Sequence, residues 1–274
     1  MTINCKGNLI DLSTPKVMSV LNITPDSFFD GGKYKNEEAI LRQVEKMLKE
    51  GATFIDVGAY SSRPGADHVS EEKELSRIMP VMGLLLKEFP QIIISVDTFR
   101  SRIAKEAIQH GAAIINDISG GNMDANMFNT VSELQVPYIL MHMLGTPQNM
   151  QQNPVYKDVT KEIISFFAAQ IFKLHQLKVN DVLIDVGFGF GKTIAHNFEI
   201  LKNLELFKSL DAPILAGVSR KSMLYKTLDI SAQEALNATT SANTIALLNG
   251  ANILRVHDVK EAIEAIKIVE QVIR

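Results

Sequence analysis

Eight short apolar runs recur along the chain, and this repetition restricts the possible folds more than any other feature. Each run is rich in β-branched residues, and most positions within it are apolar. Such continuous hydrophobicity is typical of parallel strands covered on both faces, whereas a half-exposed antiparallel sheet would alternate. The runs occupy residues 17–22, 53–59, 92–98, 113–119, 137–143, 182–189, 213–219 and 253–258.

The segments between these runs have the periodicity of amphipathic helices. In the first, Ile40, Val44 and Met47 share one face. Near the end of the chain, Asp258 and Glu261 have the spacing of a capping box before a last helix. Alternation of strand and helix repeated eight times predicts the α/β class, as a single (β/α)₈ TIM barrel.

The length of 274 residues agrees with the roughly 250 residues typical of such barrels. No linker or break in composition divides the chain, so one domain over 1–274 is expected. Within it, residues 16–274 form the barrel, and a short N-terminal extension over 1–15 closes its bottom. Chemistry in these barrels takes place where the strands end, because the following loops converge on one face.

The composition argues against several classes of partner. The net charge of −3 gives no overall attraction to nucleic acid or to an anionic membrane. The N-terminus lacks the pattern of a secretory signal, and no apolar run approaches the roughly 18 residues that span a bilayer. The single cysteine, Cys5, cannot form an internal disulfide, which fits a reducing compartment. We therefore expect a cytoplasmic protein without nucleic-acid or membrane partners.

Polar residues end the predicted strands, where a barrel core would prefer apolar ones. One Asp or Asn at such a place is commonly a helix cap or turn residue, but here all eight strands have a polar residue at or shortly after their ends. An unpaired buried polar group costs roughly 1–3 kcal/mol, so their convergence indicates a polar ligand. Asp97, Asn116 and Asp185 suit the edge of a flat heterocycle with amino and ring N–H groups. The full set is Asn22, Asp56, Asp97, Asn116, His142, Asp185, Lys221, Arg255 and His257.

Cationic side chains cluster at the same predicted ends, which indicates a local anion site in a chain of negative net charge. Guanidinium groups match phosphate oxygens with two parallel hydrogen bonds, so phosphate or diphosphate is the favoured ligand. Taken alone, Arg63 is also explained as a solvated charge. The cluster comprises Arg63, Arg220, Lys221, Arg255 and His257.

Two glycine-bearing stretches are candidate binding loops. The stretch 185–193 is no nucleotide P-loop, because Val186 stands where that motif requires Gly. Its glycines more plausibly bring the backbone close to a ligand, with Phe188 or Phe190 as an apolar wall. The stretch 22–32 is polar and ends in glycines, as expected of a lid over a site.

The histidines His68, His110, His175 and His196 lack the spacing of a transition-metal site. Mg²⁺ needs only one or two protein oxygens beside a substrate phosphate, and Asn22 is a candidate.

The chain resembles the dihydropteroate synthase family from about Lys16 to its end. The motifs NITPDSF, SSRPGA, VDT, IND, LMHM, DVGFGFGK, SRKS and LRVHD occur in that order. The resemblance implies a homodimeric barrel that condenses (7,8-dihydropterin-6-yl)methyl diphosphate with p-aminobenzoate in folate synthesis and releases diphosphate. Mg²⁺ would be the cofactor, and sulfonamides would be competitors. Candidate dimer surfaces are 236–248 and 262–273, although core packing explains their apolar residues equally well.

The resemblance also implies roles for matching residues. Lys221, Asp97, Arg255 and His257 would be catalytic, and Asn22 would bind the metal. The site for the pterin diphosphate would contain Ser62, Asp97, Asn116, Asp185, Lys221, Arg255 and His257. The p-aminobenzoate site would contain Phe28, Ser62, Arg63, Pro64, Phe190 and Ser222.

Two residues depart from the family pattern. Its Glu-Ser-Thr-Arg-Pro-Gly reads Tyr-Ser-Ser-Arg-Pro-Gly here, so that Tyr60 replaces an acid and Ser62 lacks a methyl group. Activity is still expected, but the shape of the aminobenzoate pocket and sulfonamide sensitivity stay open.

Two other functions compete with this one. A methyltetrahydrofolate-type methyltransferase would not need the SRKS, LRVHD or NITPDSF motifs. A catalytically silent pterin-binding paralogue would have no evident reason to keep Asn22, Asp97, Lys221 and Arg255 together.

Overall fold

The computed structural model describes residues 1–23, 33–60 and 69–273, with side chains in the first helix described from residue 37. Most of the predicted lid over 22–32 therefore lies outside the described residues. No helix in the described ranges is long and apolar enough to cross a membrane.

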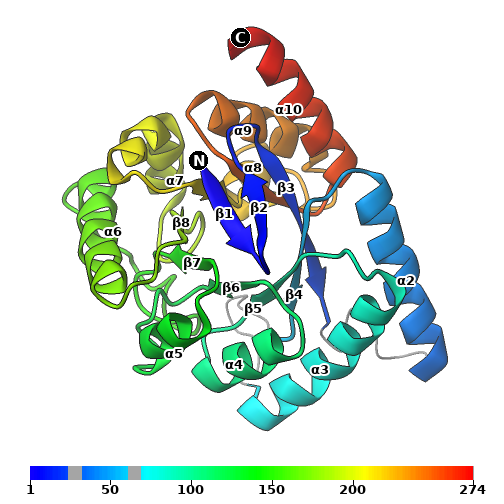
Figure 1. The fold of residues 1–274 in the computed structure, drawn as a ribbon. Coiled ribbons are helices and arrows are strands. Elements are labelled where there is room, and N and C mark those ends of the chain that lie inside the picture. The colour runs from blue at the N-terminus through cyan, green and yellow to red at the C-terminus, as the bar shows by residue number, and fades with distance from the viewer. Residues whose placement is uncertain (24–32, 61–68, 274) are drawn as a thin grey trace.

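Eight parallel strands form a closed barrel, in the order β10-β3-β4-β5-β6-β7-β8-β9 (Figure 1). Each lies within, or one residue beyond, one of the eight apolar runs, so the predicted TIM barrel is confirmed. The strands are β3 (Lys16–Asn22), β4 (Phe54–Gly58), β5 (Ile94–Asp97), β6 (Ile114–Asp117), β7 (Tyr138–Met141), β8 (Val182–Asp185), β9 (Ile214–Ala216) and β10 (Ile253–Val256).

Helices follow the strands and surround the barrel (Figure 1). Several begin at side-chain caps: Ser70, Asp158 and Thr193 accept hydrogen bonds from backbone N–H groups in the first turns of α3, α6 and α7. The helices are α2 (Lys33–Lys49), α3 (Glu71–Glu88), α4 (Ser101–Gln109), α5 (Met127–Leu134), α6 (Val159–Gln176), α7 (Ile194–Lys202), the 3₁₀ helix η1 (Leu204–Leu210), α8 (Ser222–Tyr225), α9 (Leu236–Leu248) and α10 (Val259–Ile273).

The predicted capping box of the last helix is not formed. Both carboxylate oxygens of Asp258 instead accept hydrogen bonds from Arg220, at 2.8 Å from Nε and 2.9 Å from Nη2. A charged partner from another loop outcompetes the local backbone N–H groups, because charge-assisted hydrogen bonds are the stronger ones.

Alternation along the strands divides the core into two parts. One set of strand side chains packs outward against the helices, and the other points into the barrel. The amino-terminal hairpin of β1 (Thr2–Cys5) and β2 (Asn8–Asp11) lies across the near opening of the barrel in Figure 1. Its buried Ile3 and Cys5 pack with inward-facing residues of the amino-terminal strand halves, such as Phe54, Leu183 and Ile253.

Candidate functional site

The inward-facing side chains of the barrel strands become polar two positions beyond the apolar residues that pack against the amino-terminal hairpin. Phe54 is followed by Asp56, Ile114 by Asn116, Leu183 by Asp185 and Ile253 by Arg255. Because side chains alternate with a period of two, all four polar groups point into the barrel toward its carboxyl end. The parallel barrel therefore gathers polar residues from distant parts of the sequence on one floor.

Asp56 lies at the centre of this floor and is fully buried. Its Oδ2 accepts hydrogen bonds from Asn116 Nδ2 at 2.9 Å and from Arg255 Nε at 2.7 Å. Its Oδ1 accepts one from Ser95 Oγ at 2.6 Å. The carboxylate thus fixes an amide and a guanidinium from distant parts of the chain.

Asp97 is the second carboxylate that contacts the guanidinium. Its Oδ2 lies 3.0 Å from Arg255 Nη2. Burial raises the pKa of Asp97 to about 7, although Arg255 opposes the rise. Burial alone would lower the pKa of Arg255, but Asp56 and Asp97 outweigh it and raise that pKa. Asp97 is therefore a half-buried acid that can ionise near neutral pH.

Asp185, Lys221 and Arg255 surround Gly217, which follows β9. A methyl group at Gly217 would lie 3.8 Å from Asp185 Oδ2, 3.9 Å from Lys221 Nζ and 4.0 Å from Arg255 Cβ. Burial raises the pKa of Asp185, and the ammonium of Lys221 is the largest opposing influence. The backbone at Gly217 therefore lies close to the carboxylate of Asp185, the ammonium of Lys221 and the first side-chain carbon of Arg255.

Lys221 directly precedes the short helix α8 and is held by the loop after β8. Its Nζ donates to the carbonyl oxygen of Phe188 and lies 4.7 Å from the centroid of the Phe190 ring. Burial lowers the pKa of Lys221 to about 8, while the carboxylate of Asp185 opposes the change. Ser222, the first residue of α8, is half-buried beside it. A desolvated ammonium, an aromatic ring and a hydroxyl-bearing residue therefore lie along one side of the floor.

Asn22 and His257 lie at the ends of neighbouring strands. Asn22 is half-buried and pairs in register with Gly58 of β4. His257 is exposed just beyond β10, with Nδ1 3.0 Å from Ser219 Oγ. Since β3 and β10 are adjacent, both residues lie at the same side of the barrel mouth.

Known proteins share both the sequence and this architecture. The family model described as "Pterin binding enzyme" matches residues 18–257. The dihydropteroate synthase of Escherichia coli is 41% identical over 272 residues, covering 98% of this chain and 96% of that protein. The enzyme of Haemophilus influenzae is 40% identical over 270 residues, with 98% of each chain covered. The chain belongs to the dihydropteroate synthase family.

Solved structures of this family agree in fold. The Yersinia pestis dihydropteroate synthase in complex with a sulfonamide drug has a TM-score of 0.92 and 41% identity, with 99% of both chains covered. The Xanthomonas albilineans enzyme with 4-aminobenzoic acid has a TM-score of 0.91 and 35% identity, covering 99% of this chain and 97% of that one. The chain is thus a transferase of folate synthesis that condenses the pterin diphosphate with p-aminobenzoate to give 7,8-dihydropteroate.

The floor contains all four residues expected to hold the pterin of a dihydropteroate synthase: Asp97, Asn116, Asp185 and Lys221. Two members of the expected cationic cluster, Arg255 and His257, lie at different levels of the site. His257 lies at the mouth, whereas the guanidinium of Arg255 is bound to Asp56 and Asp97 on the floor. These bonds use Nε and Nη2, and Nη1 forms no hydrogen bond to another described residue.

Two residues expected to face the ligand, Arg220 and His142, have other partners, as does Asp117. Arg220 donates to Asp258 and to the carbonyl oxygens of Ala232 and Gln233, which removes it from the predicted anion cluster. His142 points out of the barrel, where its ring meets Phe166 edge-on. Asp117 of the IND motif also points outward. Its carboxylate accepts hydrogen bonds from Ser119, Gly121 and Tyr138. Alternation explains the last two, since Met141 and Asn116 are the inward-facing neighbours.

Most of the expected aminobenzoate residues, Phe28, Ser62, Arg63 and Pro64, lie outside the described residues. Phe190 and Ser222 are described and flank Lys221, whereas Phe188, the alternative wall, is buried in the core beneath the helices. Tyr60, which replaces the family's acid, packs edge-on against Phe99, and its Oη accepts from Gln148 Nε2 at 3.0 Å.

Sequence reasoning missed two buried polar residues of the site. Asp56 was predicted to lie at a strand end, but not to accept the hydrogen bonds that hold Arg255 and Asn116 in place. Lys192 was counted only within the glycine-rich motif, yet it is almost completely buried with its Nζ among carbonyl oxygens. The signal for Asp56 was its place two residues beyond an inward-facing Phe54. No local signal predicts the partners of Lys192.

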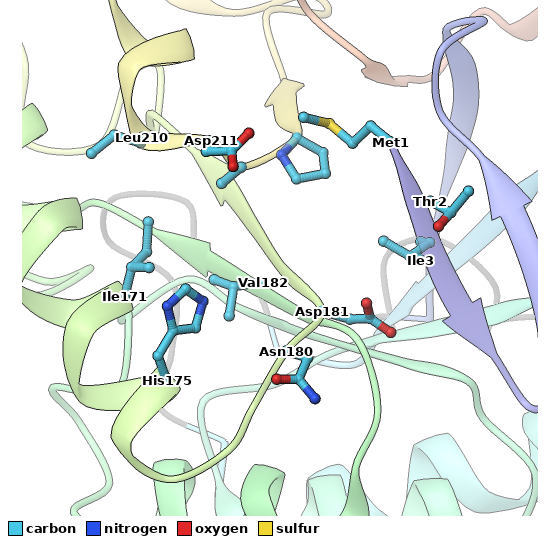
Figure 2. A pocket seen from close by; sticks show the side chains of 12 residues that line it. Met1, Thr2, Ile3, Ile171, His175, Asn180, Asp181, Val182, Leu210 and Asp211 are labelled. Carbon is cyan, nitrogen blue, oxygen red and sulfur yellow. The ribbon is translucent and has the colours of Figure 1, made fainter.

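A separate cavity of about 120 Å³ lies at the opposite end of the strands (Figure 2). Met1 of the hairpin, His175 of α6, and the residues just before β8 and β9, such as Asp181 and Pro213, line it. Because β8 and β9 run away from this cavity, it lies apart from the polar floor.

Proposed function

We propose that the condensation takes place at the carboxyl end of the barrel, with the pterin ring on the floor between Asp97, Asn116 and Asp185. The observation that supports this proposal is the group of hydrogen-bond donors and acceptors that surrounds Gly217 and Asp56. The two carboxylates suit the ring N–H and amino groups, the amide of Asn116 adds further hydrogen-bonding capacity, and Lys221 suits a ring acceptor.

The diphosphate would extend toward the mouth, where Asn22 and His257 end adjacent strands. Asn22 faces inward, and its amide forms no hydrogen bond to another described residue. No cluster of three or more His, Cys, Asp or Glu able to hold a metal occurs among the described residues. A lone amide oxygen fits Mg²⁺, which is commonly held by one or two protein oxygens together with phosphate oxygens and water. Mg²⁺ bound there would neutralise charge on the diphosphate.

The mechanism we propose is dissociative. The bond between the pterin methylene carbon and the diphosphate oxygen breaks first, and the electron pair leaves with diphosphate. Asp97 and Asp185, held close to the ring, stabilise the resulting pterin cation electrostatically. The neutral amine of p-aminobenzoate then forms the new carbon–nitrogen bond and loses a proton to solvent, so orientation matters more than a strong base.

The aminobenzoate would bind beside Lys221, against Phe190 and Ser222. Ser62, Arg63 and Pro64, with Phe28, would complete this pocket, as the family resemblance implies. Sulfonamides would compete there, which the sulfonamide complex of the Yersinia pestis relative supports. We also propose a cytoplasmic location, which the free thiol of Cys5 supports.

Diphosphate release with both substrates and Mg²⁺ tests this proposal. The wild-type chain should release one diphosphate for each dihydropteroate formed, and the Lys221→Ala variant should lose most of this activity. Absence of turnover would favour the silent paralogue. In single turnovers, the dissociative path predicts diphosphate release without p-aminobenzoate. Release that requires the amine, at a rate that follows its nucleophilicity, would contradict that path.

We further propose that the chain forms a homodimer through α9 and α10. A groove of about 480 Å³ lies between these helices, lined by residues such as Thr240 and Ile268. Ile268 is 67% exposed and Val272 69%, so α10 presents an apolar stripe to solvent. Ile268→Glu should shift the sedimentation coefficient to that of a monomer. Phe172→Glu is the matched control, because Phe172 is 64% exposed on α6. An unchanged coefficient for Ile268→Glu would contradict this interface.

A further inference from the structure

Lys192 is an almost completely buried lysine, and no carboxylate of the described residues is in hydrogen-bond contact with it. Its side chain leaves the end of the loop after β8, and only 3% of the residue is exposed. Nζ lies 3.0 Å from the carbonyl oxygen of Gly187, 2.9 Å from that of Phe190 and 3.2 Å from that of His142. The Nδ1 atom of His142 lies 3.1 Å away. Four acceptors therefore surround three ammonium hydrogens.

These contacts connect two loops at the carboxyl end of the barrel. Gly187 and Phe190 belong to the loop after β8, and His142 follows β7. Burial lowers the pKa of Lys192, and the carboxylate of Asp185 opposes this change. Carbonyl oxygens that converge on one point repel one another unless a donor or cation lies between them. The ammonium of Lys192 thus serves as an internal cation that holds the β8 loop in its closed turn.

The same two loops approach each other more closely than side chains would permit. Gly187 has φ 68° and Gly191 φ 64°, a region that favours glycine. A methyl group at Gly187 would lie 2.0 Å from the carbonyl oxygen of His142, and one at Gly191 2.5 Å from that of Leu144. The conformation of the β8 loop is therefore closely determined by backbone packing on the β7 loop.

The other side of the β8 loop faces the proposed pterin site. Phe188, between two residues whose carbonyl oxygens bind Lys192, accepts a hydrogen bond from Lys221 Nζ through its own carbonyl oxygen. The ring of Phe190 lies under the same ammonium, and the N–H of Gly187 donates to Asp185 Oδ1 at 2.8 Å. A change in this loop would thus displace groups that contact both Lys221 and Asp185.

We propose that Lys192 is a positioning residue for the binding of the pterin diphosphate. Its ammonium binds the carbonyl oxygens of Gly187 and Phe190 and thereby connects the β8 loop to the β7 loop. These contacts fix the positions of the Phe188 carbonyl and the Phe190 ring, which orient Lys221. This inference rests on the pterin-binding role proposed above for Lys221.

Steady-state kinetics of Lys192→Met, which keeps the side-chain length without the charge, test the proposal. The KM for the pterin diphosphate should rise at least tenfold. His142→Phe removes one of the four acceptors around Lys192, the ring Nδ1, and should raise this KM by a smaller factor. Val131→Ala, a buried change on α5, is the control for destabilisation alone and should leave this KM unchanged. If Lys192→Met and Val131→Ala have equal KM values, the proposal is wrong.

A double-mutant cycle separates positioning from a general structural effect. In a Lys221→Met background, Lys192→Met should raise the dissociation constant of the pterin diphosphate by less than threefold, because the group it positions is absent. An undiminished, tenfold effect in that background would overturn the proposal. If wild-type protein makes no dihydropteroate, the proposed function fails instead, and the cycle still reports on binding.

Chemical rescue provides a test that does not depend on the stability of Lys192→Met. In Lys192→Ala, the missing atoms correspond to n-propylammonium. Added n-propylammonium should lower the KM for the pterin diphosphate toward the wild-type value, whereas 1-propanol should not. Equal effects of the two additives, or no effect of either on a folded Lys192→Ala protein, would contradict the role of the buried cation.

Discussion

Replacement of Asp56 by Asn removes one negative charge from the floor while keeping its shape. The amide oxygen of the new side chain can still accept from Arg255 and Asn116, and its NH₂ group can donate to the hydroxyl of Ser95. The half-buried guanidinium of Arg255 then retains Asp97, at 3.0 Å, as its hydrogen-bonded carboxylate. The variant therefore isolates the contribution of charge from that of hydrogen bonding.

The magnitude follows from the contacts that remain. Removing the only partner of a buried ion pair costs roughly 3–5 kcal/mol, and a hydrogen bond to a charged group contributes about 1 kcal/mol more than a neutral one. Since Asp97 remains, Asp56→Asn should lower the free energy of unfolding by about 2 kcal/mol. The double variant Asp56→Asn/Asp97→Asn leaves Arg255 without a hydrogen-bonded carboxylate, so its loss should exceed the sum of the single losses.

Urea unfolding followed by far-ultraviolet circular dichroism at pH 8 measures these differences. At this pH Asp97, whose pKa is raised to about 7 by burial, is mostly ionised. Asp211→Asn is the control, because Asp211 is exposed and carries no charge partner on the floor. If Asp56→Asn is as stable as the wild type, or the double variant is merely additive, the floor is not held by this charge network.

Three other changes have distinct expected outcomes. The kcat/KM for the pterin diphosphate should fall below about pH 7, because Asp97 becomes protonated, and above about pH 8, because Lys221 becomes deprotonated. The variant Asp97→Asn should no longer show the fall below about pH 7. Because the folded pKa of Asp97 exceeds its ordinary value of 3.8, this group should also lower the free energy of unfolding as the pH rises from about 4 to about 7. Gly217→Ala should fold normally, since the atoms nearest to the added methyl group are 3.8 Å away or farther. It should raise the KM for the pterin diphosphate at least tenfold and leave the KM for p-aminobenzoate unchanged. A KM for the pterin diphosphate equal to that of the wild type would contradict the position of the ring. Asn22→Ala should raise the Mg²⁺ concentration needed for half-maximal activity several-fold, and an unchanged requirement in a Mg²⁺ titration would exclude Asn22 as a ligand.

The parts of the site that follow from periodicity could be predicted from the sequence. The continuous apolar runs indicate buried parallel strands, and a polar residue two positions beyond an inward-facing apolar one must point into the barrel. Asn116 and Asp185 are found in this way, and Asp97 lies two positions beyond Ser95 on the inward-facing row that begins at Ile93. His142 was misplaced because its position at a strand end was counted without the alternation that turns it outward.

Contacts between distant loops could not be predicted in the same way. Arg220 and Asp258 are 38 positions apart and meet only because β9 and β10 are neighbours. The carbonyl oxygens around Lys192 come from two loops whose approach depends on backbone packing at Gly187. The sequence contains the residue types, but the choice between a substrate contact and a structural contact depends on the register and on the paths of these loops.

A crystal structure with the pterin diphosphate bound would test the location of the site most directly. We expect ring nitrogen or oxygen atoms within hydrogen-bond distance of Asp97, Asn116 and Asp185, and the diphosphate at the mouth near His257. A ring bound elsewhere, such as in the cavity beside His175 at the opposite end of the strands, would contradict the account.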